Sequence, residues 1–330
     1  MNIVVSLVIV SGLFLLGLAG AVPGMGWVFG VAIPYLALAL FAGGLIYRVL
    51  NWARIPVPFR IPTTCGQQKA LPWIKSQSLE NPHNALAAIG RMALEVLLFR
   101  SLLRNTKSQL IDGDRLAYAS SPWLWIGAMA MHWSFVIILI RHVRLMTNPV
   151  PFFVRFVEET DGFFEVWLPV VYATSVIFLA ALAYLLLRRL ASPQLRYISL
   201  LADYFPLLLL LGIGISGFCL RHLVKTDVTA VKQLATGLAG LAPTAPADSI
   251  SPWFYGHLFL VCVLLAYFPF SKLTHMAGVF LSPTRNLANS NRMVRHVNPW
   301  DYPVKVHPYE EYEDELRDKM KAAGLPVDKQ

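Results

Sequence analysis

Long runs of apolar residues, separated by short polar segments, dominate the chain. Each run is close to the ~20 residues that an α-helix needs to cross the hydrocarbon core of a bilayer. The runs predict six membrane-spanning helices, at residues 3–22, 27–49, 122–143, 164–187, 201–220 and 253–277. Ser-Pro pairs at 121–122 and 251–252 mark the starts of two of them, because proline is favoured in the first turn of a helix. The pattern predicts an all-α integral membrane protein.

The composition agrees with a location in the lipid bilayer. Of the 330 residues, 56% are hydrophobic and only 14% are charged. The net charge of +9 does not indicate nucleic-acid binding, because the basic residues cluster beside the apolar runs. The three cysteines, Cys65, Cys219 and Cys262, lack the spacing of a disulfide framework or an iron–sulfur site.

Lysine and arginine are distributed unevenly among the segments that connect the runs. Twenty of them lie in 51–121, 188–199 and 282–330, on one side of the predicted bundle, and six lie in the opposite loops. Because basic segments remain on the cytoplasmic side, both termini are expected in the cytoplasm. We therefore expect a multi-pass protein of the cytoplasmic (inner) membrane.

Three parts of the chain differ in character. A first helix occupies 1–24, a membrane domain with a cytoplasmic insertion at 51–121 occupies 25–281, and a charged cytoplasmic tail occupies 282–330. In the insertion, Asn81 is the expected cap of a helix from about 82 to 104. This helix has an apolar side that suits a membrane surface or a partner. The tail is expected to be extended, with a short terminal helix.

Two pairs of histidines lie in the apolar runs. His132 and His142 are ten residues apart, and His257 and His275 are eighteen apart. An imidazole inside a lipid-spanning helix is costly unless it has a partner. The two helices run antiparallel in the predicted topology, which places His142 at the depth of His257. His132 then lies at the depth of His275, and a continuous helix would separate His257 from His275 by about 27 Å on one face.

Each pair suits the two axial positions of a haem iron. With both positions filled by imidazole, the iron transfers electrons without binding oxygen. The chain has no CxxCH motif, so the haems are expected to be non-covalent, b-type. We predict two haems b, the outer one on His142 and His257 and the inner one on His132 and His275. These pairs are called the outer pair and the inner pair below.

Residues near the histidines are candidates for further contacts with the haems. Arg141 and Arg144 are expected to meet the propionates of the outer haem, and Arg285 those of the inner haem. Gly256 and Gly278, beside the ligands, are expected to leave room for a flat ring.

Two other classes of function use such histidines differently. A proton or metal transporter would need acidic partners within the spans, where the chain has almost none and Asp203 lies at an end. A structural anchor would not need four histidines at matching depths. Bound haem distinguishes these classes from the cytochrome hypothesis.

The histidine motifs resemble those of the respiratory nitrate reductase gamma subunit. The segment HLFLVCVLLAYFPFSKLTH, from His257 to His275, resembles its last membrane helix in spacing and in the FPFS motif. The spacing of His132 and His142, the segment 188–211 and the motif at 167–169 (Trp-Leu-Pro) are also similar. The resemblance covers 27–50 and 122–281. It implies a five-helix di-haem cytochrome b core that exchanges electrons with a quinone.

Three features depart from that family: the additional helix at 3–22, the longer insertion at 51–121, and Ala173 where the family has a lysine important for the quinone site. They resemble the DsrM family, the membrane subunit of the sulfite-reduction-associated DsrMKJOP complex. This resemblance implies menaquinone or menaquinol as substrate, a cytoplasmic iron–sulfur partner like heterodisulfide reductase (DsrK-like), and further membrane and periplasmic subunits, in sulfite or sulfur respiration. The alternative is the gamma subunit of another quinol-linked reductase complex. Either way, the chain is expected to be an electron-transfer subunit and not a complete enzyme.

Polar residues at the outer end suggest a place for the quinone. Quinol oxidation releases two protons, so carboxylates near an aqueous face suit its chemistry. The candidates near the outer pair are Arg155, Glu159, Asp161 and Tyr172.

Overall fold

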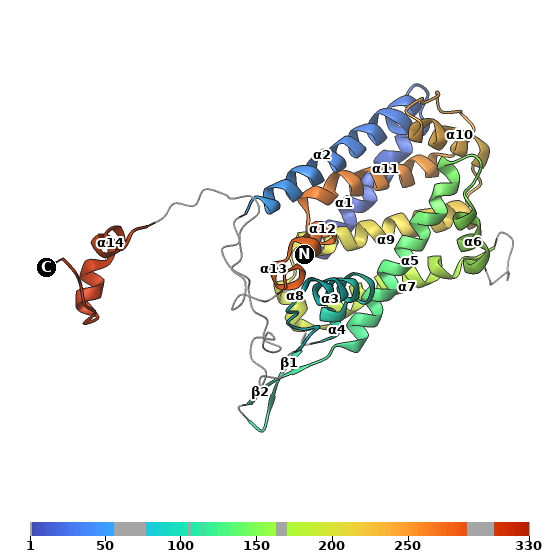
Figure 1. Cartoon of the computed structure of the whole chain (residues 1–330). Coiled ribbons are helices and arrows are strands. Elements are labelled where there is room, and N and C mark those ends of the chain that lie inside the picture. The colour runs from blue at the N-terminus through green and yellow to red at the C-terminus, as the bar shows by residue number, and fades with distance from the viewer. Residues whose placement is uncertain are drawn as a thin grey trace.

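The computed structural model describes residues 2–55, 77–104, 107–113, 115–162, 170–288 and 307–329 (Figure 1). In this part of the chain, six helical segments are long and apolar enough to cross a membrane, which confirms the predicted number. They are Asn2–Ala21, Val28–Ala53, Pro122–Met146, Ala173–Ala191, Leu201–His222 and Pro252–Phe270. The protein is therefore an all-α, multi-pass membrane protein.

The α-helical parts of these segments form one bundle. They are α1 (Asn2–Gly17), α2 (Ile33–Ala53), α5 (Pro122–Met146), α7 (Ala173–Ala191), α9 (Leu201–His222) and α11 (Pro252–Tyr267). Helix α11 packs against α1, α2 and α9, whereas α5 packs against α7, which in turn packs against α9. Helix α1 contacts both α9 and α11, so it belongs to the packed bundle.

Shorter elements gather at the two ends of the bundle (Figure 1). One end, called the α6–α10 end, carries α6 (Phe152–Asp161) and α10 (Val228–Ala239). The opposite end, called the α3–α13 end, carries α3 (Ala85–Leu98), α4 (Arg100–Leu103), α8 (Pro193–Ile198), α12 (His275–Gly278), α13 (Pro283–Asn286) and an antiparallel hairpin of β1 (Lys107–Ile111) and β2 (Arg115–Ala119). The sequence analysis did not predict α6, α10 or the hairpin.

The fourth span begins later than predicted. Helix α7 starts at Ala173 rather than at 164, and 170–172 is not helical. The Asp161 carboxylate accepts a hydrogen bond from the backbone N–H of Thr174 at 2.9 Å. That N–H belongs to the first turn, where a helix has no carbonyl of its own to offer. Asp161 of α6 therefore provides a hydrogen-bond acceptor for the first turn of α7. The motif at 167–169 lies outside the described residues.

The last span is not one continuous helix, which corrects the expectation that His257 and His275 share a single helical face. Helix α11 ends at Tyr267, and two 3-10 turns, Phe268–Phe270 and Lys272–Thr274, precede α12. Pro269 lacks the N–H that would continue the ladder, and its ring clashes with the preceding turn. The Ser271 side chain then caps the second turn by accepting from Leu273 N at 3.1 Å.

Glycines allow α1 and α11 to cross closely. A Cβ atom on Gly17 would lie 2.8 Å from Gly256 Cα, and one on Gly256 would lie 2.6 Å from the Phe14 ring. The space beside Gly256 therefore holds Phe14 and not a haem, so that expectation was wrong. A Cβ atom on Gly278 would lie 3.5 Å from the Trp52 ring.

The close crossing predicts a difference between two glycines of α1. Gly17→Val should lower the stability of the bundle by about 1–3 kcal/mol, because the added atoms force the helices apart. Gly12→Val is the control, since a Cβ there meets nothing within 4 Å. Thermal unfolding in detergent, followed by circular dichroism, measures both. Equal midpoints for the two variants would contradict the packing.

The insertion contains a helix that differs in detail from the prediction. Helix α3 is capped by Asn84, whose Oδ1 accepts from Ala87 N at 2.8 Å, whereas Asn81 is buried and precedes the helix. The helix breaks at Phe99 before α4 begins. Its predicted apolar side is exposed, with Leu86 at 78% and Ile89 at 65%.

The charged tail contains the predicted terminal helix, α14 (Tyr309–Ala322). The buried Glu313 carboxylate accepts hydrogen bonds from the backbone of Asp328 at 2.7 Å and of Lys329 at 2.8 Å. These contacts fold the last residues back onto α14. The part of the tail at 289–306 lies outside the described residues.

Candidate haem and quinone sites

The inner pair lies at the α3–α13 end. His132 comes from the first half of α5, and His275 is the first residue of α12. Their ring centroids are 6.0 Å apart, and their planes meet at 83°. Imidazole–metal bonds of about 2 Å on each side would place two opposed ring centroids roughly 6 Å apart. The separation fits two axial ligands of one iron.

The outer pair lies toward the α6–α10 end. His142 is near the end of α5, and His257 is in the second turn of α11. His257 precedes the break in the last span, and the His275 ring beyond the break lies 6.0 Å from the His132 ring.

The Nδ1 atoms of the four histidines share one property: each faces a hydrogen-bond acceptor. In three cases the acceptor is a carbonyl of the preceding turn: His132 with Ala128 O at 2.8 Å, His142 with Ile138 O at 2.7 Å, and His275 with Lys272 O at 2.9 Å. A carbonyl cannot donate, so the proton is on Nδ1 and the Nε2 lone pair is free for a metal. Metal-binding histidines are usually oriented in this way.

The Nδ1 atom of His257 also has a hydrogen-bond partner, but this partner lies on α9. Its Nδ1 lies 2.9 Å from Ser216 Oγ, which itself donates to Ile213 O at 3.1 Å. The hydroxyl therefore accepts from the imidazole. Next to it, a Cβ on Gly217 would lie 3.1 Å from His257 Cε1. Ser216 and Gly217 were not among the predicted site residues, although the small residues at 212, 214, 216 and 217 stand out in a leucine-rich helix.

The glycine next to Ser216 provides a test of the outer site. Gly217→Val should displace the His257 imidazole and remove most of the absorbance of the outer haem, while the inner haem remains. Gly43→Val, on α2, is the control, because a Cβ there meets nothing within 4 Å. Reduced-minus-oxidised spectra of the purified variants measure the change. Full occupancy in Gly217→Val would show that α9 does not position His257.

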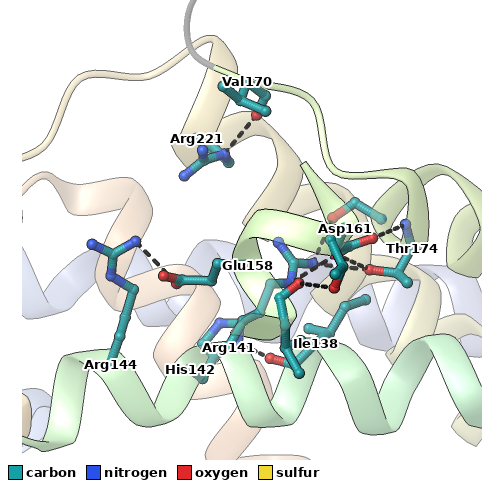
Figure 2. Close-up of polar contacts among 12 residues, drawn as sticks. Ile138, Arg141, His142, Arg144, Glu158, Asp161, Val170, Thr174 and Arg221 are labelled. Carbon is teal, nitrogen blue, oxygen red and sulfur yellow. Dashed lines mark hydrogen bonds and ion pairs between the residues drawn. The ribbon is translucent and has the colours of Figure 1, made fainter. Parts of the chain in front are cut away.

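A buried ionic cluster lies beside His142 (Figure 2). Arg141 Nε is 3.0 Å from Asp161 Oδ2, although its N–H is not aligned for a hydrogen bond. The other end of the guanidinium donates to Thr174 Oγ1 and Ser175 Oγ, both at 3.2 Å. Thr174 Oγ1 in turn donates to Asp161 at 2.5 Å. The cluster joins α5, α6 and α7.

The Tyr172 ring contacts two arginines in the same region. The guanidinium carbon of Arg141 is 3.8 Å from the centre of the tyrosine ring, and that of Arg221 is 4.3 Å from it. Arg221 also donates to Val170 O at 3.1 Å. Tyr172 is only 8% exposed, so both cation–π contacts are made with a buried ring.

The structure separates the predicted quinone residues into two groups. Asp161 and Tyr172 lie together in the buried cluster, whereas Arg155 and Glu159 are exposed on α6.

The candidate propionate ligands also occupy different surroundings. Arg141 is neutralised by Asp161, and Arg144 forms an ion pair with Glu158 at 2.9 Å. Arg285 lies on α13, which packs against α3 near the inner pair.

Six apolar helices that carry these four histidines agree with the class of all-α membrane cytochromes b. Residues 92–297 match the family model of the nitrate reductase gamma subunit. The chain belongs to this family, as its histidine spacings predicted.

Two relatives extend the match over most of the chain. The Hdr-like menaquinol oxidoreductase cytochrome b-like subunit of Archaeoglobus fulgidus is 46% identical over 283 residues, which cover 84% of each protein. The protein of the same name from Archaeoglobus profundus is 40% identical over 276 residues, or 82% of each. The similarity to these subunits agrees with the resemblance to DsrM.

Proposed function

We propose that this chain is the membrane cytochrome b subunit of a menaquinone-linked oxidoreductase complex. Two haems b would be held by the outer pair, His142 and His257, and by the inner pair, His132 and His275. Haem b with two imidazole ligands supplies one-electron transfer and has no open position for oxygen. The names of the two relatives, which include menaquinol oxidoreductase, support a quinone as the redox substrate.

The observation that carries this proposal is the shared state of the four histidines. All four Nδ1 atoms have a hydrogen-bond partner, and the rings of the inner pair lie with their centroids 6.0 Å apart. A histidine that carries protons across a membrane would need both nitrogens accessible in turn. The described residues also contain no group of three or more histidine, cysteine or acidic side chains that could hold a bare metal ion. Both points favour haem over transport.

The residues near the outer pair have separate roles in this proposal. The Arg141–Asp161 pair keeps α5, α6 and α7 in register beside His142 without leaving a net charge there. The quinone would bind near Asp161 and Tyr172, with Arg155 and Glu159 at the aqueous edge, where protons can leave. Arg141, Arg144 and Arg285 are the proposed propionate contacts. Arg141 and Arg144 would have to bind a propionate while they also pair with Asp161 and Glu158.

The orientation and the partners complete the proposal. The protein would lie in the cytoplasmic membrane with both termini inside, so that the α6–α10 end faces outward. At the α3–α13 end, a cytoplasmic iron–sulfur subunit like DsrK would exchange electrons with the inner haem. Further membrane and periplasmic subunits would complete the complex, which would act in sulfite or sulfur respiration.

A quinol-reduction experiment tests whether electrons from quinol reach the inner haem through the outer haem. Menadiol should reduce both haems of the purified complex under anaerobic conditions. In His142→Ala, which lacks an outer ligand, menadiol should reduce the inner haem far more slowly, whereas dithionite should still reduce it. Unchanged menadiol reduction of the inner haem in this variant would place the quinone site elsewhere.

A further inference from the structure

The helix break at Phe99 is unusual. Phe99 follows α3 with φ 47° and ψ 45°, the left-handed conformation that glycine adopts at helix ends without steric cost. Its N–H still donates to Glu95 O at 3.1 Å, so the helical hydrogen bonds continue up to this residue. A large side chain in this conformation is strained and persists only where the surroundings fix it.

Two tryptophans of α5 fix the end of α3. The indole N–H of Trp125 donates to Leu98 O at 2.6 Å, and that of Trp133 donates to Leu97 O at 3.1 Å. Carbonyls in the last turn of a helix have no partner within it. The two indoles therefore attach the end of α3 to the spanning helix that carries His132.

The turn after Phe99 is held from the other side by Glu95. Its carboxylate accepts from Ser101 N at 3.0 Å and from the Ser101 hydroxyl. Leu102 N donates to Phe99 O at 2.8 Å, which starts α4 immediately. The direction of the Phe99 side chain is thus set by contacts before and after it.

Ion pairs and a hydrogen bond of Glu80 also hold α3 and α4 together. Glu80 pairs with Arg100 and Arg104 of α4 and its flank, and its backbone carbonyl accepts from Arg91 at 2.7 Å. Partial burial raises the pKa of Glu80, but the hydrogen bond and charge of Arg100 and the charge of Arg104 outweigh it and lower the pKa overall. The carboxylate therefore stays charged at neutral pH and keeps its contacts.

These contacts hold the Phe99 ring against His132, a proposed haem ligand. The Phe99 and His132 rings meet edge to face, with centroids 4.9 Å apart and planes at 71°. His275 lies on another side of His132, at 6.0 Å. Phe99 therefore limits how the His132 imidazole can rotate and covers part of it.

We propose that Phe99 is a positioning residue for the inner haem. It fixes the plane of the His132 imidazole and excludes water from one side of this ligand. The inference rests on the proposed function, because it requires a haem on the inner pair. A less polar surrounding disfavours the more highly charged ferric state, so Phe99 raises the reduction potential of the inner haem.

The variant Phe99→Gly removes the ring and suits the left-handed backbone, so α3 should keep its place. In a redox titration of the purified complex, the ferrous-to-ferric ratio of the inner haem should fall about threefold to tenfold at a fixed potential. A tenfold fall corresponds to about 59 mV for a one-electron couple. The low-spin ferric signal of the inner haem in electron paramagnetic resonance should also shift. The outer haem should show neither change.

Tryptophan variants provide a matched comparison. Trp125→Phe combined with Trp133→Phe keeps the rings but removes both N–H donors, and should shift the inner haem in the same direction. Trp123→Phe is the control, because Trp123 lies on the same helix and is 73% exposed. An unchanged inner haem in Phe99→Gly, or an equal shift of both haems, would overturn the inference. Absence of haem from the unmodified complex would instead overturn the proposed function.

Discussion

Replacing His142 with alanine is expected to remove the outer haem and to leave the inner haem in place. The two pairs share no residue, and their nearest backbone supports differ: Ile138 for His142, and Ala128 and Lys272 for the inner pair. An iron with one of its two axial imidazoles removed loses the coordination that retains it. The dithionite-reduced b-type absorbance should therefore fall by about half.

The reciprocal variant, His275→Ala, should leave only the outer haem, with a distinct absorbance maximum or potential. His222→Ala is the control, because His222 ends α9 and its ring lies against Phe218, with centroids 4.4 Å apart, outside both pairs. Pyridine haemochromogen measurements on the purified variants give the haem content. Retention of full haem in His142→Ala, or the same loss in His222→Ala, would refute the assignment of ligands.

Replacing Asp161 with alanine is expected to destabilise the bundle strongly. The Arg141 side chain is 10% exposed, and Asp161 is its acidic partner at 3.0 Å. Removing one member of a buried ion pair leaves an uncompensated charge and costs about 3–5 kcal/mol. The start of α7 also loses its hydrogen bond to Thr174 N. Thermal unfolding in detergent should show a clearly lower midpoint.

A second ion pair on the same helix provides the comparison for Asp161. Glu158 pairs with Arg144, whose side chain is 49% exposed. Glu158→Ala should cost only about 0–1 kcal/mol, because water can solvate the remaining arginine. If the two variants unfold at the same temperature, the Arg141–Asp161 pair does not have the stabilising role given to it here.

The parts of the fold that could be predicted depend on local properties of the sequence. A span of about 20 apolar residues and a histidine inside it are visible without knowing what packs around them. Pro269 was visible in the sequence, but we expected one continuous helix and did not predict a break there. The later start of α7 depends on Asp161, a residue of another helix. Such a contact cannot be recognised from the apolar pattern alone.

The site was predictable to the same extent. The proposed pairing of the four histidines follows from spacing and antiparallel topology, and the structure brings the rings of His132 and His275 to within 6.0 Å of each other. The acceptor Ser216 lies 41 residues from His257, and Trp133 lies 36 residues from Leu97, so packing alone brings them together. The occupant of the space beside Gly256 also depends on which helix crosses there, and this is α1. Side chains that support a ligand are therefore harder to predict than the ligand.

The haem content of the unmodified chain tests the central claim most directly. The protein should be purified with its partner subunits from cells with adequate haem supply, and its pyridine haemochromogen spectrum related to the amount of chain. We expect two haems b per chain. One haem would mean that one of the two histidine pairs is wrongly assigned, and none would contradict the cytochrome function altogether.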